Sequence, residues 1–470
     1  MHRMTRPVCL VFSFILASSL LLVSAAGRAD GHRMDLLSLY LRANEYDAEI
    51  AAARAEYEAA RTSVSLARSN VRPQASLGFT ASYNDVNPDL SGNFVDWGPN
   101  LSLRQTIYNK IHLATIDQAK ATEKQAEAQL EAQTQELILR VAQAYFDVLQ
   151  AESELLFRRS ELDAIERQKE QNERRFDVGL VAITDVRDAQ AQFDLATAQE
   201  IAAKNSLEAA REALTLLTGL PVKNLAQLAD SAPLLPPTPE NVQAWETLAL
   251  QQNLPLIVAE LAVRSAQAEL SASRAERYPT LDLVGIAVSS NTSRNDAQGN
   301  NGFRDGIDSG ELRLEFNLPL LTGGRTKALV SQSKALARVA RQELELQKRR
   351  TLQETRNAYR NVIANISQVN ALKQALSSTQ QSLEAQEAGF DEGLLTSLEV
   401  LRSLQDTFSA QSDYAAARYQ YIVNTLFLKR AAGTLAESDI RLINSWLTGA
   451  QPKTPESSDS NTALRLNNNG

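Results

Sequence analysis

The stretch FDVGLVAITDV at residues 176–186 lies between two long segments of helical composition, and the related stretch FDEGL recurs at residues 390–394. Each stretch carries a glycine, at positions 179 and 393. Glycine often ends a helix because it adopts a left-handed backbone conformation at no steric cost. Both stretches therefore predict a turn between two helices. Their separation of 214 residues, from 176 to 390, indicates one structural unit used twice.

The same offset of 214 aligns residues on both sides of these turns. Ala144-Tyr145 matches Ala358-Tyr359, and Gly219 matches Gly433. The offset holds without a gap over roughly a hundred positions, which is the signature of an internal repeat. A constant offset over such a length indicates helices whose length is under geometric constraint.

The helical segments are unusually long for a globular protein. The segment from 109 to 176 contains no proline and no glycine, and as a helix of ~1.5 Å rise per residue it is about 100 Å long. Periodic helices of this length are typical of coiled coils. The first half predicts helices over 35–72, 109–176 and 184–218, and the second half over 242–277, 325–390 and 397–432.

Four shorter segments alternate between apolar and polar residues and predict strands at 74–84, 99–108, 280–290 and 311–320. In the last of these, Leu312, Leu314 and Phe316 share one face. Such strands fit a membrane β-barrel and fit equally a soluble sheet with one wet face. A barrel in lipid has no open edge and needs at least about eight strands. One chain offers four, so two or three chains would have to share a barrel.

Composition argues against an enzyme. Among 470 residues there are three histidines, His2, His32 and His112, and one cysteine, Cys9. The sequence contains no Gly-x-Gly-x-x-Gly and no P-loop. We therefore predict no catalytic residues, no metal site and no cofactor.

Residues 1–29 have the features of an export signal. Two arginines precede a mostly apolar run over 8–23, and small residues allow cleavage after Ala26 or Ala29. Removing this segment takes away three arginines and no acid, so the net charge changes from −8 to −11. An acidic chain is a poor partner for nucleic acid. No run of 18 apolar residues follows, so we expect no membrane-spanning helix.

The chain is therefore predicted to divide into segments that follow the repeat. They are a signal peptide (1–29), a first unit (30–219) with its hairpin at 109–218, a proline-rich linker (220–242), a second unit (243–433) with its hairpin at 325–432, and a final segment (434–470) with a disordered polar end.

Together these features resemble the TolC family of outer-membrane channel-tunnels, the outer membrane factors of Gram-negative efflux and type I secretion systems. The resemblance covers residues 35–447 and is most specific at 176–186, 390–394 and 432–435. It implies a mainly helical fold with membrane β-structure, in which a homotrimer shares a twelve-stranded β-barrel in the outer membrane. The helices would form a coiled-coil tunnel across the periplasm, with an equatorial region from the linker and the final segment.

The resemblance also implies a function and partners. The chain would conduct substrates passively from an inner-membrane ABC or proton-driven transporter, through a periplasmic adaptor, across a membrane whose lipid it contacts. The main alternative is a periplasmic adaptor or coiled-coil scaffold without a channel, although adaptors usually carry one helical hairpin per chain. A soluble exported enzyme is a second alternative.

Family gate acids correspond to Asp185 and Glu399, with Thr184 and Arg402 beside them. In a trimer Glu399 would form a ring of three carboxylates that attracts cations. The alternative is helix capping by Thr184, Asp185, Ser397 and Glu399, because acids and hydroxyls in a first helical turn satisfy free N–H groups. Both roles can coexist.

The resemblance places the tip turns, with Gly179, Leu180, Gly393 and Leu394, where an adaptor docks. The chain departs from the family pattern at the gate: Arg402 replaces a pore acid, Phe390 replaces a locking tyrosine, and Leu395 replaces a locking arginine. As a hypothesis, Arg402 pairs instead with Asp185 or Glu399.

Overall fold

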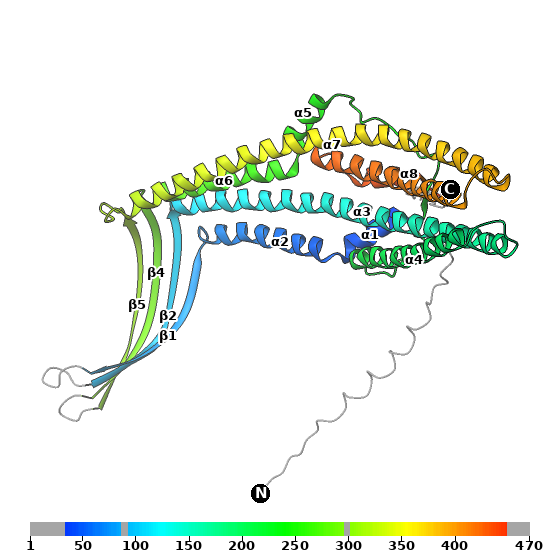
Figure 1. The fold of residues 1–470 in the computed structure, drawn as a ribbon. Coiled ribbons are helices and arrows are strands. Elements are labelled where there is room, and N and C mark those ends of the chain that lie inside the picture. Colours follow the sequence, from blue (N-terminus) through cyan, green and yellow to red (C-terminus); the bar gives the residue numbers. More distant parts are fainter. Residues whose placement is uncertain (1–32, 86–92, 296–300, 449–470) are drawn as a thin grey trace, which may run out of the picture.

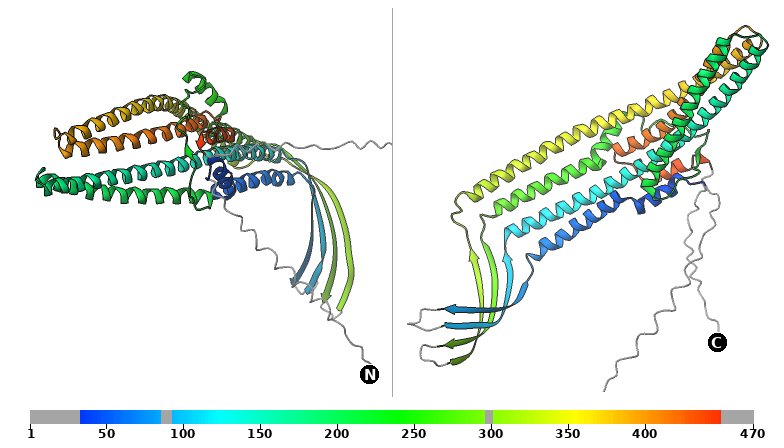
Figure 2. Two further views of the ribbon diagram at one scale, coloured as in Figure 1. Left: turned by 90° about the vertical axis from the view of Figure 1, so that its right-hand side faces the viewer. Right: turned by 60° about the horizontal axis from the view of Figure 1, so that its bottom comes forward.

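The structure, a computed structural model, describes residues 33–85, 93–295 and 301–448. The predicted signal peptide and the predicted disordered end lie outside the described residues. The strands gather at one end of the molecule, and long helices extend from them to the other end (Figure 1). Figure 2 shows the two long hairpins running side by side. The molecule is therefore elongated, with a sheet end and a helical tip.

In the described residues, each half of the chain contains two short helices, two long strands and a long helical hairpin. The helices are α1 (Leu36–Tyr46), α2 (Ala48–Ser69), α3 (Lys110–Asp177), α4 (Ile183–Thr218), α5 (Val242–Gln252), α6 (Leu254–Ala275), α7 (Arg325–Asp391), α8 (Ser397–Ala431) and α9 (Glu437–Asn444). The strands are β1 (Gln74–Asp85), β2 (Asn93–Tyr108), β3 (Gln227–Leu228), β4 (Thr280–Asn295), β5 (Asn301–Asn317) and β6 (Leu447–Thr448). Among the described residues, no helix combines the length and the apolarity needed to cross a membrane.

The two hairpins match each other closely in length. Helix α3 has 68 residues and α7 has 67, whereas the return helices α4 and α8 have 36 and 35. Helix α2 packs on the part of α3 near the sheet and α4 packs on the distal part (Figure 1); α6 and α8 flank α7 in the same way. Each long helix is thereby covered along most of its length by two shorter ones.

The helices predicted at 35–72 and 242–277 are each broken in two, which corrects the sequence interpretation. Buried Asp47 separates α1 from α2, and its carboxylate accepts the N–H of Ile50 at 2.9 Å. Buried Asn253 separates α5 from α6 in the same way. Pro255 in the first turn of α6 is a normal helix-start signal that the interpretation passed over. Each of these polar side chains caps the following helix and is held by another element. These hydrogen bonds offset the backbone hydrogen bonds that are lost where the helix breaks.

The main apolar core lies midway along the molecule, where α1, α3, α8 and the linker meet. The rings of Phe146 and Tyr419 stack with centroids 5.8 Å apart. The hydroxyl of Tyr145 donates to the carbonyl of Ala226 at 2.6 Å. Fully burying side chains of this size stabilises a fold by about 1.5–3 kcal/mol each. The core therefore ties both hairpins and the linker into one body.

The four long strands form one antiparallel sheet in the order β1-β2-β4-β5. Leu77 lies opposite Leu101, Leu101 opposite Ala287, and Ala287 opposite Gly310. Strands β1 and β5 have no partner on their outer sides within the described chain. The short strands β3 and β6 form a separate pair near the core.

The strands are longer than the alternation predicted, and one ends earlier. Strand β2 begins at Asn93 rather than residue 99, and β4 extends to Asn295. Strand β5 runs over Asn301–Asn317 rather than 311–320. In β4 and β5 the added residues are largely Asn, Ser, Asp and Gly, whereas in β2 the added Val95 and Trp97 continue the alternation of Leu101 and Leu103. At the other end Pro319 has no N–H to donate to a ladder.

Candidate functional site

Both turns at the helical tip have the same backbone hydrogen bonds. The N–H groups of Gly179 and Leu180 donate back to carbonyls at the end of α3, at 2.9 and 2.8 Å. Gly393 and Leu394 repeat the pattern on α7 at 3.0 and 2.8 Å. The two glycines have φ angles of +76° and +72°, and no atom lies within 4 Å of where a Cβ would stand. Glycine is needed here for its backbone conformation and not for space.

The tips expose apolar side chains. Leu180 is 73 % exposed and Leu394 is 80 % exposed, and Val178 is similarly open at 69 %. Three large apolar side chains are therefore exposed in the tip turns of the two hairpins. Such groups mark candidate contact sites for another protein.

The candidate gate acids cap helices. The carboxylate of Asp185 accepts the N–H of Ala182 at 3.1 Å at the start of α4. The carboxylate of Glu399 accepts the N–H of Thr396 at 2.7 Å and its hydroxyl at 2.9 Å at the start of α8. These bonds lower the pKa of Glu399, the backbone N–H most strongly, then the hydroxyl, with a smaller effect of the Arg402 charge. Each acid therefore performs the capping role within one chain.

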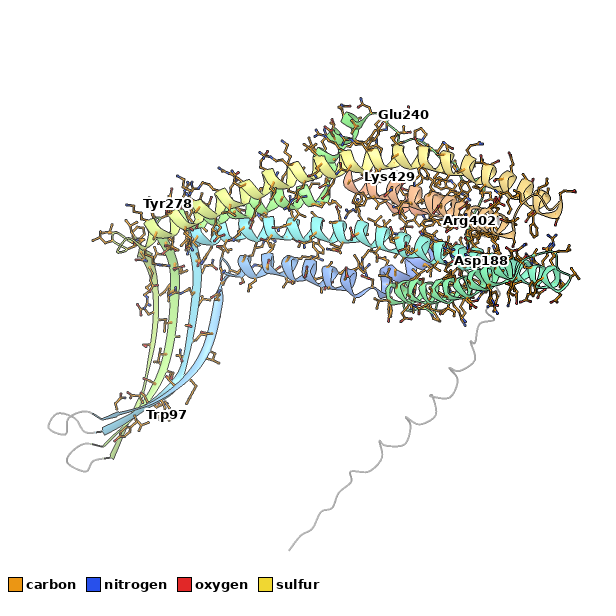
Figure 3. The ribbon with its side chains drawn as sticks, in the orientation of Figure 1. Trp97, Asp188, Glu240, Tyr278, Arg402 and Lys429 are labelled. Atoms are coloured by element: carbon orange, nitrogen blue, oxygen red, sulfur yellow. The ribbon has the colours of Figure 1, made fainter. Side chains whose placement is uncertain are left out.

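Thr184 lies exposed in the first turn of α4, and Arg402 lies exposed in the second turn of α8. Arg402 lies on α8, in the half of the bundle distal to the sheet (Figure 3). Within the described residues of one chain, its guanidinium makes no ion pair with Asp185 or Glu399. The pairing hypothesised from the sequence is thus absent inside a single protomer.

A buried polar cluster joins the two hairpins just above the tip. Asn172 is fully buried on α3, and its amide donates to the hydroxyl of Ser397 on α8 at 2.7 Å and to the carbonyl of Asp185 at 3.3 Å. Gln168 donates to the same hydroxyl at 3.1 Å. The Ser397 hydroxyl was expected to cap α8, but it accepts hydrogen bonds from the amides of Asn172 and Gln168 on α3. Buried polar groups fix one arrangement of their elements because leaving them unpaired is costly.

Phe390 and Leu395 depart from the family pattern, and both side chains pack against neighbouring residues at the tip. The Phe390 ring is buried, and the Arg175 guanidinium lies 4.2 Å from its centroid. Arg175 also pairs with Asp391 at 3.5 Å. Leu395 packs against Gly389, where an added Cβ would stand 2.8 Å from its side chain. Helices α3 and α7 thus meet at the tip through one stacked cation and one ion pair.

The sheet has two chemically distinct faces. One face exposes large apolar side chains along three strands, with exposures of 40 to 77 %. These residues are Leu77, Phe79, Tyr83, Leu101, Leu103, Leu312, Leu314 and Phe316. A soluble protein seldom leaves an apolar surface of this extent in water.

The opposite face carries charges close to the helices. Arg104 lies 3.9 Å from Asp282 and 3.5 Å from Glu315, so three strands are joined by one guanidinium. Arg313 pairs with Glu311 and Glu315 at 3.4 and 2.8 Å. A sheet with one apolar and one charged face fits lipid on the first side and water on the second.

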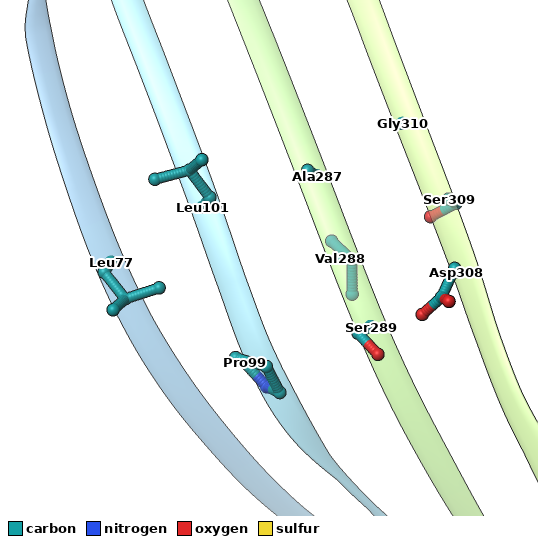
Figure 4. A pocket seen from close by; sticks show the side chains of 9 residues that line it. All are labelled: Leu77, Pro99, Leu101, Ala287, Val288, Ser289, Asp308, Ser309 and Gly310. Carbon is teal, nitrogen blue, oxygen red and sulfur yellow. The ribbon is translucent and has the colours of Figure 1, made fainter.

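A shallow hollow of about 460 Å³ crosses this sheet (Figure 4). Leu77 lines it on β1 and Pro99 and Leu101 line it on β2. The lining on β4 and β5 consists of Ala287, Val288, Ser289, Asp308, Ser309 and Gly310. The described residues contain no group of three or more His, Cys, Asp or Glu side chains that could hold a metal.

Sequence reasoning identified the tip turns and both capping acids but missed the buried Asn172 cluster. Gln168 and Asn172 are four residues apart and so share a helix face, which is a weak signal within a polar helix. Their partner, Ser397, lies 225 residues beyond Asn172. Only the packing of α3 against α8 brings these groups together.

The chain matches the model of the family described as outer membrane efflux protein over residues 39–220 and 245–434. It is 36 % identical over 418 residues to the outer membrane protein TolC of Vibrio cholerae, covering 89 % of this chain and 94 % of the relative. It is 27 % identical over 437 residues to the alkaline protease secretion protein AprF of Pseudomonas aeruginosa, covering 90 % of each chain.

The fold also resembles that of solved channels. The outer membrane protein VceC of Vibrio cholerae superposes with a TM-score of 0.72 at 18 % identity, over 85 % of this chain and 96 % of that one. The resemblance to the TolC family stated from the sequence is thereby confirmed. The chain is an outer-membrane efflux or secretion channel whose helices lie in the periplasm, and it belongs to the outer membrane efflux protein family.

Proposed function

We propose that three copies of this chain form one passive conduit, a twelve-stranded barrel in the outer membrane continued by a tunnel of helices. A periplasmic adaptor and an inner-membrane ABC or proton-driven transporter deliver the substrate, and the conduit itself catalyses no reaction. The two halves of each chain contribute equivalent hairpins to the tunnel, as an internal two-fold repeat.

The observation that carries this proposal is the sheet, which has four strands and two free edges. Strands β1 and β5 each present a row of backbone N–H and C=O groups that no other described strand pairs with. In lipid every such group needs a partner, so an open four-stranded sheet is not viable. Pairing β5 of one copy with β1 of the next removes every edge, and three copies give twelve strands.

The helices at the same edges support this arrangement. Helix α7 follows β5 and α2 precedes β1, so joining the strands brings α7 of one copy beside α2 of the next. Helix α7 exposes Leu336, Val339 and Leu346, of which the last two line a groove of about 700 Å³. Leu66 of α2 is 70 % exposed. These apolar residues would pack together between copies.

The proposed gate lies at the helical tip, with Glu399, Asp185, Arg402 and Thr184. Glu399 is exposed, and its carboxylate is fixed by Thr396. Three such groups around one axis would favour cations at the constriction. Arg402, one turn further along α8, would pair with an acid of a neighbouring copy. The exposed tip turns with Gly179, Leu180, Gly393 and Leu394 would receive the adaptor.

Conductance of the mature protein in a planar lipid bilayer tests the conduit. Discrete steps of current with a preference for cations are expected. Glu399→Gln keeps an acceptor for the Thr396 N–H but removes the charge, so it should weaken the cation preference. Glu384→Ala, an exposed acid on α7, is the matched control and should leave the preference unchanged. Folded, inserted protein that never conducts, even after Arg402→Ala, would contradict the proposal.

Arg402→Ala tests the proposed pairing separately. If Arg402 holds the gate through an acid of another copy, its removal raises the current that leaks through the closed channel. An unchanged leak would refute the pairing and leave the conduit intact. A chain that remains in the soluble periplasmic fraction would favour the scaffold or adaptor alternative instead.

A further inference from the structure

A belt of basic residues surrounds the junctions between the sheet and the helices. We define this collar as residues 70–73, 109–112, 274–279 and 318–327, the four places where a strand meets a helix. It contains six basic residues and one acid, Glu276, in a chain whose overall net charge is −8. The basic residues are Arg72, Lys110, Arg274, Arg277, Arg325 and Lys327, and all are exposed.

Most of these charges have no ion-pair partner among the described residues. Arg325 pairs with Glu276 at 3.4 Å. Among the described residues no carboxylate lies within ion-pair distance of Arg72, Arg277 or Lys327. The ammonium of Lys110 lies 3.7 Å from the centroid of the Tyr278 ring. Tyr278 is half exposed where α6 meets β4 (Figure 3). A cation on a half-exposed tyrosine is typical of a membrane–water interface.

The collar continues the apolar face of the sheet. Leu312, Leu314 and Phe316 on β5 lead directly into Leu320 and Leu321, which are 83 % and 96 % exposed. Large apolar side chains this exposed are costly in water but favourable in the acyl region of a bilayer. The collar therefore lies at the level where lipid tails end and headgroups begin.

We infer that the collar binds anionic phospholipid headgroups of the leaflet that faces the periplasm. The long Lys and Arg side chains reach to the phosphates while Tyr278, Leu320 and Leu321 rest at the acyl boundary. The inference rests on membrane insertion of the sheet and goes beyond channel function. Each basic residue near an anionic lipid surface contributes about 1 kcal/mol, or about a fivefold preference for a charged headgroup over a neutral one.

Lys110 and Arg277 provide the cleanest test. They lie at the inner ends of the central strands β2 and β4, away from the edges where copies would meet. Native mass spectrometry of the solubilised, assembled protein, titrated with phosphatidylglycerol or with phosphatidylcholine, gives an apparent dissociation constant for each lipid. We expect phosphatidylglycerol to bind at least about fivefold more tightly. Added salt should reduce this preference.

The double variant Lys110→Gln/Arg277→Gln should lose most of the preference for phosphatidylglycerol, and Lys110→Arg/Arg277→Lys should retain it. Lys204→Gln/Lys223→Gln removes two exposed charges far from the collar and should behave as the parent protein. The same spectra report the assembled mass, so a variant that fails to assemble is recognised. If Lys110→Gln/Arg277→Gln does not assemble, the test is whether Lys110→Arg/Arg277→Lys retains the preference for phosphatidylglycerol.

Equal binding of both lipids by the parent protein would overturn the inference. So would a preference that survives Lys110→Gln/Arg277→Gln. Lys110- and Arg277-dependent sedimentation with purified peptidoglycan, without lipid preference, would assign the collar to the cell wall instead. A protein that inserts and conducts but shows no preference for phosphatidylglycerol refutes this inference alone, whereas failure to insert refutes the conduit.

Discussion

Replacing Asn172 by alanine should loosen the contact between the two hairpins at the tip. The amide of Asn172 donates two hydrogen bonds, to Ser397 at 2.7 Å and to the carbonyl of Asp185 at 3.3 Å, from a fully buried position. Each buried hydrogen bond contributes about 1 kcal/mol, and the small cavity left behind adds to the loss. We expect local opening of the tip to become easier by about 2–3 kcal/mol.

Hydrogen–deuterium exchange measures this effect directly. If exchange occurs through local opening, amides near the starts of α4 and α8 should exchange roughly 30- to 150-fold faster in Asn172→Ala. Amides in the core around Tyr145 should not change, because the tip opens without global unfolding. Asn205→Ala, an exposed asparagine on α4, is the matched control.

A double-mutant cycle separates the shared bond from other effects. Ser397→Ala removes the acceptor, so the double variant Asn172→Ala/Ser397→Ala should cost about 1 kcal/mol less than the sum of the single variants. Additive costs would show that Asn172 and Ser397 do not act together. Unchanged exchange at the tip in Asn172→Ala would refute the reasoning as a whole.

Three further predictions concern single residues. Gly393→Ala should lower the free energy of unfolding by about 1 kcal/mol, because alanine is strained at a φ of +72° but its Cβ meets no other atom. Gly433→Ala should lower it by more than about 3 kcal/mol, because its Cβ would stand 2.0 Å from the carbonyl oxygen of Gln252. Chemical denaturation compares the two variants, and equal losses would contradict the clash. Arg140→Gln should destabilise the fold by about 1–3 kcal/mol at pH 7, because Arg140 donates two hydrogen bonds of 3.1 Å to buried Asp47. Burial alone would raise the pKa of Asp47, but Arg140 and the Ile50 N–H bring that pKa below its ordinary value. The stabilisation by the Asp47 carboxylate is therefore full above pH ~4 and is lost as the pH falls through the pKa of the folded protein. The effect of Arg140→Gln on thermal unfolding should thus shrink at acid pH. An effect of equal size at pH 7 and pH 3 would show that Arg140 acts through packing.

The long-range features of the fold were predictable because each repeats in the sequence. The offset between residues 176 and 390 revealed two hairpins, and the alternation around Leu312 revealed the sheet. Helix ends marked by glycine were located to within one or two residues, as at Gly179. These signals are local, so they can be read without knowing what packs against them.

The break at Asp47 was not predictable by the same means, and the break at Asn253 was marked in the sequence only by Pro255. Each side chain caps a helix only because another element holds it, Arg140 for Asp47 and the carbonyl of Ala431 for Asn253. The same limit applies to Ser397, whose position predicted a cap but whose hydroxyl accepts from Asn172. Where the partner is distant in sequence, only the packing of helices decides which hydrogen bond forms.

The two free edges of the sheet have a consequence for assembly. In the proposed assembly β5 of one copy pairs with β1 of the next, so every contact is head to tail and of the same kind. Head-to-tail contacts close into a ring only when the rotation between neighbours divides a full circle; otherwise they continue as a filament. In that assembly the curvature of the four strands would set the number of subunits, and a change in sheet twist far from any interface would alter the width of the pore.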